Sequence, residues 1–162
     1  MGLILAVETS SGESIPSWFS RTDSKSLLHI LGAARSEDRR DPVVRFLAAT
    51  GGSLNGLTTI VGAEEEPLDS FMARDPTDER REYWYREHAQ REAAWQDPRK
   101  LTEEIDRLLA LLEAPSPALS ELSVSDEYFS EGLFVQDIRD LRAMLAWAAG
   151  HGIPKVRLVI IP

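Results

Sequence analysis

A run of four apolar side chains near the C-terminus, Leu158, Val159, Ile160 and Ile161, constrains the fold more than any other feature of the sequence. A strand that is apolar on both faces is normally central in a sheet or covered on both sides. Burying these four side chains stabilises a fold by roughly 6–10 kcal/mol before conformational entropy is subtracted. The run therefore predicts a central strand over residues 156–161.

The segment before this strand has the pattern of an amphipathic helix over residues 135–149. Apolar side chains recur along it at helical spacing, as Phe134, Ile138, Leu141 and Leu145 do. Asp137 and Asp140 lie largely off that apolar face, where such a helix carries its charged side chains. Two glycines, Gly150 and Gly152, then supply a helix stop. The C-terminal part of the chain thus predicts a helix, a turn and a buried strand.

Two further segments have the composition of strands. Residues 3–7 are apolar throughout, and no basic region precedes them, so we expect a buried strand beside residues 156–161 and not a signal peptide. Residues 57–61 combine apolar and threonine side chains, which is typical of a strand. These segments together predict a small sheet.

Residues 3–11, with the sequence LILAVETSS, resemble the first strand and phosphate-facing turn of the actin-like ATPase superfamily, especially its tRNA-threonylcarbamoylation proteins. In that family the acidic residue and the hydroxyls, which here match Glu8, Thr9 and Ser10, face nucleotide or metal. The resemblance covers about nine residues of 162, and IPSWFS at residues 15–20 stands where the family has a hairpin of apolar strands. A strand followed by a Ser/Gly turn is the interpretation we favour.

Four dipeptides have the form of helix starts, because an Asp or Ser N-cap before a proline satisfies and orders the first turn. They are Asp41-Pro42, Asp75-Pro76, Asp97-Pro98 and Ser116-Pro117. They predict helices over residues 42–50, 77–96 and 98–113, the first ending at the glycine-rich residues 51–56. We expect the last two to pack antiparallel, because only a short break separates them.

The remaining segments are less regular. Residues 24–33 predict a short helix, and residues 62–73 predict an acidic loop. Residues 118–133 predict a helical turn, then a strand-like alternation at Leu122 and Val124, and then a loop. The fold predicted for residues 1–162 is a single helix-rich α+β domain. Its small sheet, with strands near 3–7, 57–61 and 156–161, is packed by four to five helices near 24–33, 42–50, 77–96, 98–113 and 135–149.

The amino-acid composition makes several classes of function less suitable for this chain. The formal net charge is −9, with fifteen arginines but only three lysines, so the chain is a poor candidate for neutralising nucleic-acid phosphates. The absence of cysteine excludes disulfides, thiol catalysis and cysteine-ligated zinc. No apolar run approaches the length of a membrane span. We expect a cytoplasmic protein of a GC-rich bacterium, and the acidity suits a basic partner.

The helix predicted over residues 77–96 carries an unusual set of side chains on one stripe. They are Trp84, His88, Arg91 and Trp95, with Glu92 adjacent, while Ala89 and Ala93 lie on the back of the helix. Trp, Tyr and Arg are enriched at binding hot spots, so we identify this stripe as the candidate partner-binding site. Packing of both tryptophans on the domain itself is the alternative. His88 and Glu92 have metal-ligand spacing, but no third and fourth ligand accompanies them, so we predict no metal.

The leading hypothesis is therefore an acidic protein-interaction module of bacterial origin. It would be an inhibitor or immunity-type protein that binds and occludes a partner protein. No nucleophile motif supports catalysis, and we expect no cofactor. The alternative is a small enzyme or ligand-binding protein that uses converging polar residues, either His88, Arg91 and Glu92 or the Glu8-Thr9-Ser10 turn. Self-association as a structural protein is a third hypothesis.

Overall fold

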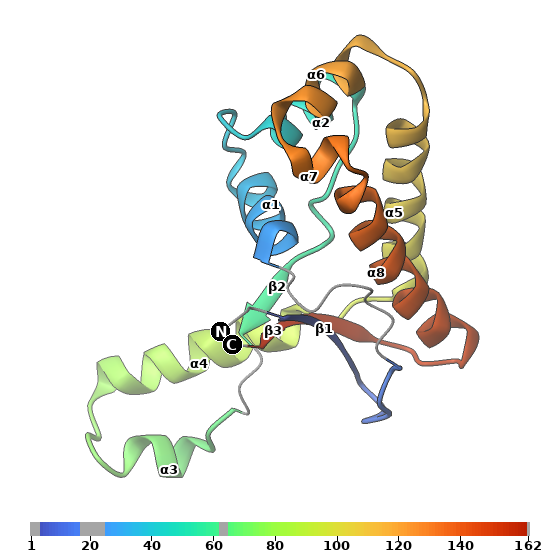
Figure 1. The fold of residues 1–162 in the computed structure, drawn as a ribbon. Helices are drawn as coiled ribbons and strands as arrows, with labels where there is room; N and C mark the ends of the chain where they lie inside the picture. The colour runs from blue at the N-terminus through green and yellow to red at the C-terminus, as the bar shows by residue number, and fades with distance from the viewer. Residues whose placement is uncertain (1–3, 17–24, 62–64, 162) are drawn as a thin grey trace.

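The computed structural model describes residues 4–16, 25–61 and 65–161, and every structural statement below concerns these residues. They form eight helices and one three-stranded sheet (Figure 1), which confirms the helix-rich α+β fold. Predictions for Leu3, for Ser24 and for residues 17–20 and 62–64 lie outside the described residues. In chain order the elements are β1 (Ile4–Thr9), α1 (Lys25–Ser36), α2 (Pro42–Thr50), β2 (Thr59–Val61), α3 (Leu68–Met72), α4 (Asp78–Ala93), α5 (Pro98–Glu113), α6 (Pro117–Ser125), α7 (Glu127–Ser130), α8 (Leu133–Gly150) and β3 (Val156–Ile161).

The C-terminal strand β3 is the centre of the sheet, as predicted. The strand order is β1-β3-β2, with β1 antiparallel and β2 parallel to β3. Leu5 lies opposite Ile160, and Ile60 lies opposite Val159. The first and last strands of the chain therefore pair directly, which closes the fold.

The two faces of β3 have different neighbours, because successive side chains of a strand point to opposite faces. Val156 and Leu158 are fully buried in the main hydrophobic cluster. Arg157 and Val159 face the other way and are also buried. Covered positions on both faces account for the apolar run as far as Val159. Ile160 is only partly buried and Ile161 is 42% exposed, so the predicted burial of all four side chains is wrong at the end of the strand.

Helices α5 and α8 pack on each other and carry much of the hydrophobic core. Both are amphipathic, and their apolar stripes are buried as the helical spacing predicted. The stripe of α5 consists of Leu101, Ile105, Leu108 and Leu112, and that of α8 of Phe134, Ile138, Leu141 and Leu145. Burial of each such side chain stabilises the fold by about 1.5–3 kcal/mol.

Three of the four predicted helix starts are confirmed. The side chains of Asp41, Asp97 and Ser116 each accept a backbone N–H of the first turn of α2, α5 and α6. The start at Asp75-Pro76 is wrong, because Thr77 is the N-cap of α4 and the helix begins at Asp78. The hydroxyl of Thr77 accepts a hydrogen bond from the Arg80 N–H. Thr77 therefore caps the first turn of α4, and no cap from Asp75 is needed.

Two acidic side chains of α8 are buried, contrary to the prediction. Asp137 is 2% exposed and Asp140 is 8% exposed. The Tyr128 hydroxyl donates to Asp137 Oδ2 at 2.6 Å, and the Gln136 amide donates to Asp140 Oδ1 at 2.8 Å. Hydrogen bonds of this kind offset the cost of removing a carboxylate from water, so helix α8 buries more of its circumference than its apolar residues alone indicate.

Residues 118–133 are helical, so the strand-like alternation at Leu122 and Val124 is a wrong prediction. Both residues belong to α6, where Leu122 is buried and Val124 is exposed. Ser116 caps α6 and Asp126 caps α7, which replaces the expected loop by two short helices. Two apolar residues at positions i and i+2 are compatible with a helix as well as with a strand, because so short a segment does not distinguish the 3.6-residue period from the two-residue period.

The short connection predicted that α4 packs antiparallel to α5, and this prediction is wrong. Helix α4 runs away from α5 and from the body of the molecule, together with α3, which forms inside the segment predicted as an acidic loop (Figure 1). We call residues 65–93, which include α3 and α4, the arm. Helix α5 packs on α8 instead, because its apolar stripe meets a matching buried stripe there, whereas α4 has no buried face.

Candidate functional site

The arm is held together by contacts between α4 and the segment before it. The indole N–H of Trp84 donates to the Glu66 carbonyl at 2.7 Å. The Trp84 ring stacks on His88 with centroids 5.0 Å apart, and His88 Nδ1 lies 2.8 Å from both carboxylate oxygens of Glu65. Two of the predicted site residues therefore bind the acidic segment of their own chain.

Helix α3 rests on the first half of α4 through aromatic and cationic groups. The Phe71 ring stacks on Tyr83 with centroids 6.2 Å apart. The Arg80 guanidinium lies 3.9 Å from the Phe71 ring centre, and its Nε donates to the Phe71 carbonyl at 2.9 Å. These contacts fix α3 against α4 although neither helix has a continuous apolar face.

The far end of α4 is anchored to the sheet by one side chain, Arg157 of β3. Its guanidinium donates to both carboxylate oxygens of Glu8 at 2.9 and 3.2 Å and to the Arg91 carbonyl at 3.2 Å. It also lies 4.1 Å from the centre of the Trp95 ring. The backbone of Gln96 pairs with Val156 of the same strand in both directions at 2.8 Å.

Arg157 brings together residues that the sequence analysis treated as two separate candidate sites. Glu8 belongs to the N-terminal turn, whereas Arg91 and Trp95 belong to the stripe at the end of α4, and all three contact Arg157. Sequence reasoning missed Arg157. The signal that could have found it is a lone arginine within the apolar run of β3, where a charge needs a partner on the neighbouring strand.

The four stripe residues, Trp84, His88, Arg91 and Trp95, are all partly buried, so each keeps part of its surface accessible. The opposite side of α4 is open. Ala89 and Ala93 are exposed, Tyr85 is 52% exposed, and α4 has no buried residue over its sixteen positions. The structure thus turns the aromatic stripe toward the chain itself and leaves the alanine side uncovered.

The other polar groups of the alternative hypothesis serve local structure. The Thr9 hydroxyl donates to the Glu13 carbonyl at 2.6 Å, and the Ser10 N–H donates to the Lys155 carbonyl at 2.9 Å. Glu92 is exposed on α4. Within the described ranges, no group of three or more His, Cys, Asp or Glu side chains is arranged to hold a metal ion.

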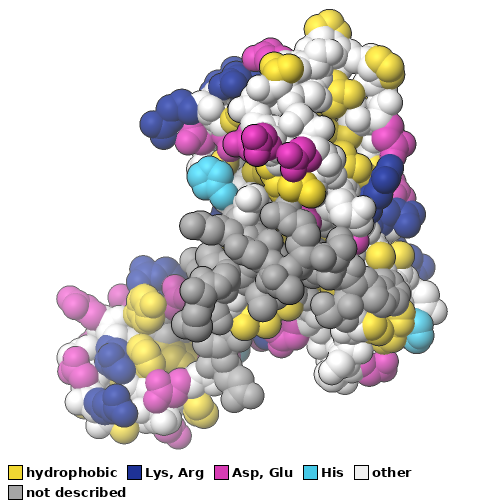
Figure 2. All heavy atoms as spheres, in the orientation of Figure 1, with side chains coloured by type: hydrophobic (Ala, Val, Ile, Leu, Met, Phe, Trp, Pro, Cys, Tyr) yellow, Lys and Arg dark blue, Asp and Glu magenta, His cyan; other side chains and the backbone are white. Residues whose placement is uncertain are grey.

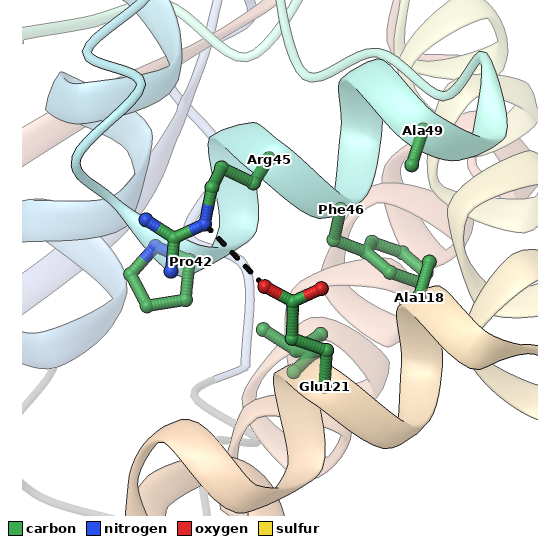
Figure 3. Close-up of a pocket in the computed structure, with 7 residues that line it drawn as sticks. Pro42, Arg45, Phe46, Ala49, Ala118 and Glu121 are labelled. Atoms are coloured by element: carbon green, nitrogen blue, oxygen red, sulfur yellow. Dashed lines mark ion pairs between the residues drawn. The ribbon is translucent and has the colours of Figure 1, made fainter.

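A small cavity lies between α2 and α6 (Figure 3). Its volume is about 30 Å³, and Arg45 Nε lies 3.8 Å from Glu121 Oε1 across its mouth. Phe46, Ala49 and Ala118 form its apolar wall. The space suffices for one or two water molecules but not for a substrate.

The arm carries a much larger hollow, of about 410 Å³, on the surface between α3 and α4. The rings of Phe71 and Tyr83 line it together with the carboxylates of Asp75 and Glu79. Arg80 is the only cationic side chain among its described lining residues. Aromatic rings beside carboxylates suit a cationic side chain, because both groups attract positive charge.

The chain matches no protein-family model, no curated protein and no solved structure. Among the helices of residues 25–61 and 65–161, none combines the length and the apolar character needed to cross a bilayer.

Proposed function

We propose that this chain is an acidic protein-interaction module that binds a basic protein partner through the arm. The observation that carries the proposal is that α4 presents sixteen residues, none of them buried, and leaves Tyr83 and Tyr85 about half exposed. Tyrosine is enriched at interfaces because its ring is large, rigid and amphipathic. A helix that contributes nothing to the core and carries such rings is suited to contact with another molecule.

The charge of the arm favours a basic partner. Residues 65–93 contain nine carboxylates and five arginines, which gives a formal net charge of −4. The whole chain has a net charge of −9, so a second copy of it would be repelled. On the arm, Figure 2 shows apolar side chains lying between charged ones, which is the combination expected of a transient interface.

Contacts within the arm and at its base support the proposal because they fix the shape of the arm and its attachment to the sheet. Trp84 and His88 bind residues 65–66 inside the arm, and Trp95, just after α4, contacts Arg157. A prearranged surface loses less conformational entropy when it binds. Occlusion of a basic partner by such a surface is the mode of action that we expect, as in small inhibitor or immunity-type proteins.

A photo-crosslinker placed at Tyr85 tests the proposal, with the same crosslinker at Val124, which is 84% exposed on α6, as the matched control. We expect a basic protein to be crosslinked from position 85 and not from position 124. The purified partner should then bind Tyr83→Ala/Tyr85→Ala about 30-fold more weakly than the unaltered chain, which corresponds to a loss of about 2 kcal/mol.

The control variant for the affinity measurement is Val124→Ala, which removes exposed apolar surface away from the arm. Its affinity should equal that of the unaltered chain. A crosslinked protein that is acidic, or one that binds the double tyrosine variant as tightly as the unaltered chain, would refute the arm as the binding surface. Failure of position 85 to crosslink any protein would count against the proposal as well.

A further inference from the structure

A large cavity lies far from the arm, where α1, the start of α2 and the α6–α7 junction meet. Its volume is about 510 Å³, which is within the range of small-molecule sites. Its described lining includes His29, Asp41, Asp126, Tyr128 and Phe129, and it includes neither lysine nor arginine. The cavity therefore has two carboxylates and no permanent cation in its described wall.

Asp41 caps α2 with one carboxylate oxygen and leaves the other without a hydrogen-bond donor from the described residues. Oδ1 accepts the N–H groups of Val43 and Val44 at 2.8 and 3.4 Å and so caps α2. Oδ2 accepts no hydrogen bond from the described residues, and His29 Nε2 lies 3.9 Å away, beyond hydrogen-bond distance. The Asp41 side chain is only 10% exposed. Oδ2 therefore keeps its capacity to accept a hydrogen bond from a ligand.

Asp126, from another part of the chain, also caps a helix with one carboxylate oxygen, although this residue is exposed. Its Oδ1 accepts the Tyr128 N–H at 2.8 Å and caps α7, while its Oδ2 has no donor among the described residues. Since Asp41 and Asp126 line the same cavity, their second oxygens add two acceptors and two formal negative charges to it. Both features select for a ligand that is positively charged and donates hydrogen bonds.

Two aromatic rings complete the wall. Tyr128 and Phe129 meet at a tilt of 62° with ring centroids 5.4 Å apart. The Tyr128 ring is fixed because its hydroxyl donates to the buried Asp137 at 2.6 Å. Aromatic faces attract organic cations and also shelter their carbon chains. A bare metal ion would find no set of three ligating side chains among the described residues.

We propose that this cavity binds a small organic cation that carries N–H donors, that is, an alkylamine or a guanidinium compound. The cationic head donates to Asp41 Oδ2 and Asp126 Oδ2, and the carbon chain lies against Tyr128 and Phe129. This binding site is separate from the arm, so its test does not depend on the proposed partner.

Titration of the full chain with agmatine, followed by calorimetry and by NMR shifts of the amides of Asp41, Asp126 and Tyr128, tests the proposal. Asp41→Asn is the decisive variant, because asparagine caps a helix as well as aspartate does but lacks the charge. Asp97→Asn is the matched control, since Asp97 caps α5 in the same way outside this cavity. The control separates site binding from general attraction to an acidic chain.

We expect agmatine to bind, Asp41→Asn to weaken its binding at least tenfold, and Asp97→Asn to leave it unchanged. Tetramethylammonium, which has the charge but no N–H donor, should bind at least tenfold more weakly than agmatine. Absence of agmatine binding at 10 mM overturns the proposal, and so does equal weakening by the two variants. Asp126→Asn replaces Asp41→Asn if thermal melts show that the latter does not fold.

Discussion

Arg157 holds its guanidinium 4.1 Å from the centre of the Trp95 ring, which places a buried cation of the central strand against the last aromatic side chain of the predicted stripe, two residues after the end of α4. The same guanidinium binds Glu8 on β1. One side chain thus connects the N-terminal strand, the C-terminal strand and the base of the arm. Together with the Gln96–Val156 backbone pair, this side chain attaches the base of the arm to the sheet.

Arg157→Met should lower the free energy of unfolding by about 1–3 kcal/mol, because the Arg91 carbonyl and Glu8 lose a charged donor. Urea denaturation measures this change, and hydrogen exchange should become faster in the last turn of α4. Arg107→Met on the exposed side of α5 is the control and should stay within about 0.5 kcal/mol of the unaltered chain. An Arg157→Met chain as stable as the unaltered one would show that the contact holds nothing in place.

Tyr128→Phe should also destabilise the chain, by about 1–3 kcal/mol, because the buried carboxylate of Asp137 loses its 2.6 Å donor. Thermal and urea denaturation give the value. Tyr85→Phe removes a hydroxyl from an exposed ring and should leave stability within about 0.5 kcal/mol. Equal effects of the two substitutions would contradict the role that we give to the buried pair.

The N-caps offer a direct comparison between two Asp-Pro pairs. Asp97→Ala should cost about 1 kcal/mol, since Asp97 Oδ1 accepts the Arg99 N–H at 2.9 Å. Asp75→Ala should cost less than about 0.5 kcal/mol, because Thr77 caps α4 in its place. Chemical denaturation of both variants checks the difference, and a larger loss at Asp75 would restore the helix start at Asp75-Pro76.

The ion pair between Asp38 and Arg40 predicts a pH dependence that can be measured. The Arg40 side chain donates to both carboxylate oxygens of Asp38 at 3.0 and 3.1 Å, and the Arg40 backbone N–H donates as well, which holds the pKa of Asp38 below its ordinary value. A lowered pKa in the folded state means that the pair stabilises the fold above the ordinary carboxyl pKa and ceases to do so as the pH falls through the folded value.

An NMR titration of the Asp38 carboxyl measures this pKa, and Arg40→Gln is the variant to compare. The midpoint should rise toward the ordinary aspartate value when the guanidinium is removed. Because the pair is exposed, the accompanying change in overall stability should be small. An unchanged midpoint in Arg40→Gln would exclude Arg40 as the cause of the shift.

Several elements could be read from local patterns. The run at residues 158–161 predicted the central strand, and the Asp and Ser caps before proline predicted the starts of α2, α5 and α6. These predictions succeed because a cap or an apolar stripe acts over one or two turns of chain. Trp84, His88, Arg91 and Trp95 were likewise grouped from helical spacing, and all four are partly buried. Trp95 lies beyond α4, however, because the helix predicted to residue 96 ends at Ala93, before Gln96 pairs with β3.

By itself, the sequence determined where most helices begin, which strands are buried and that α4 carries a stripe of aromatic and cationic residues. Only the tertiary structure decided that this stripe turns toward Glu65, Glu66 and Arg157, that Asp137 and Asp140 are buried, and that Asp41 and Asp126 share one cavity. The physical reason is distance along the chain. Glu8 and Arg157 meet across 149 residues, and no local pattern records a partner that far away.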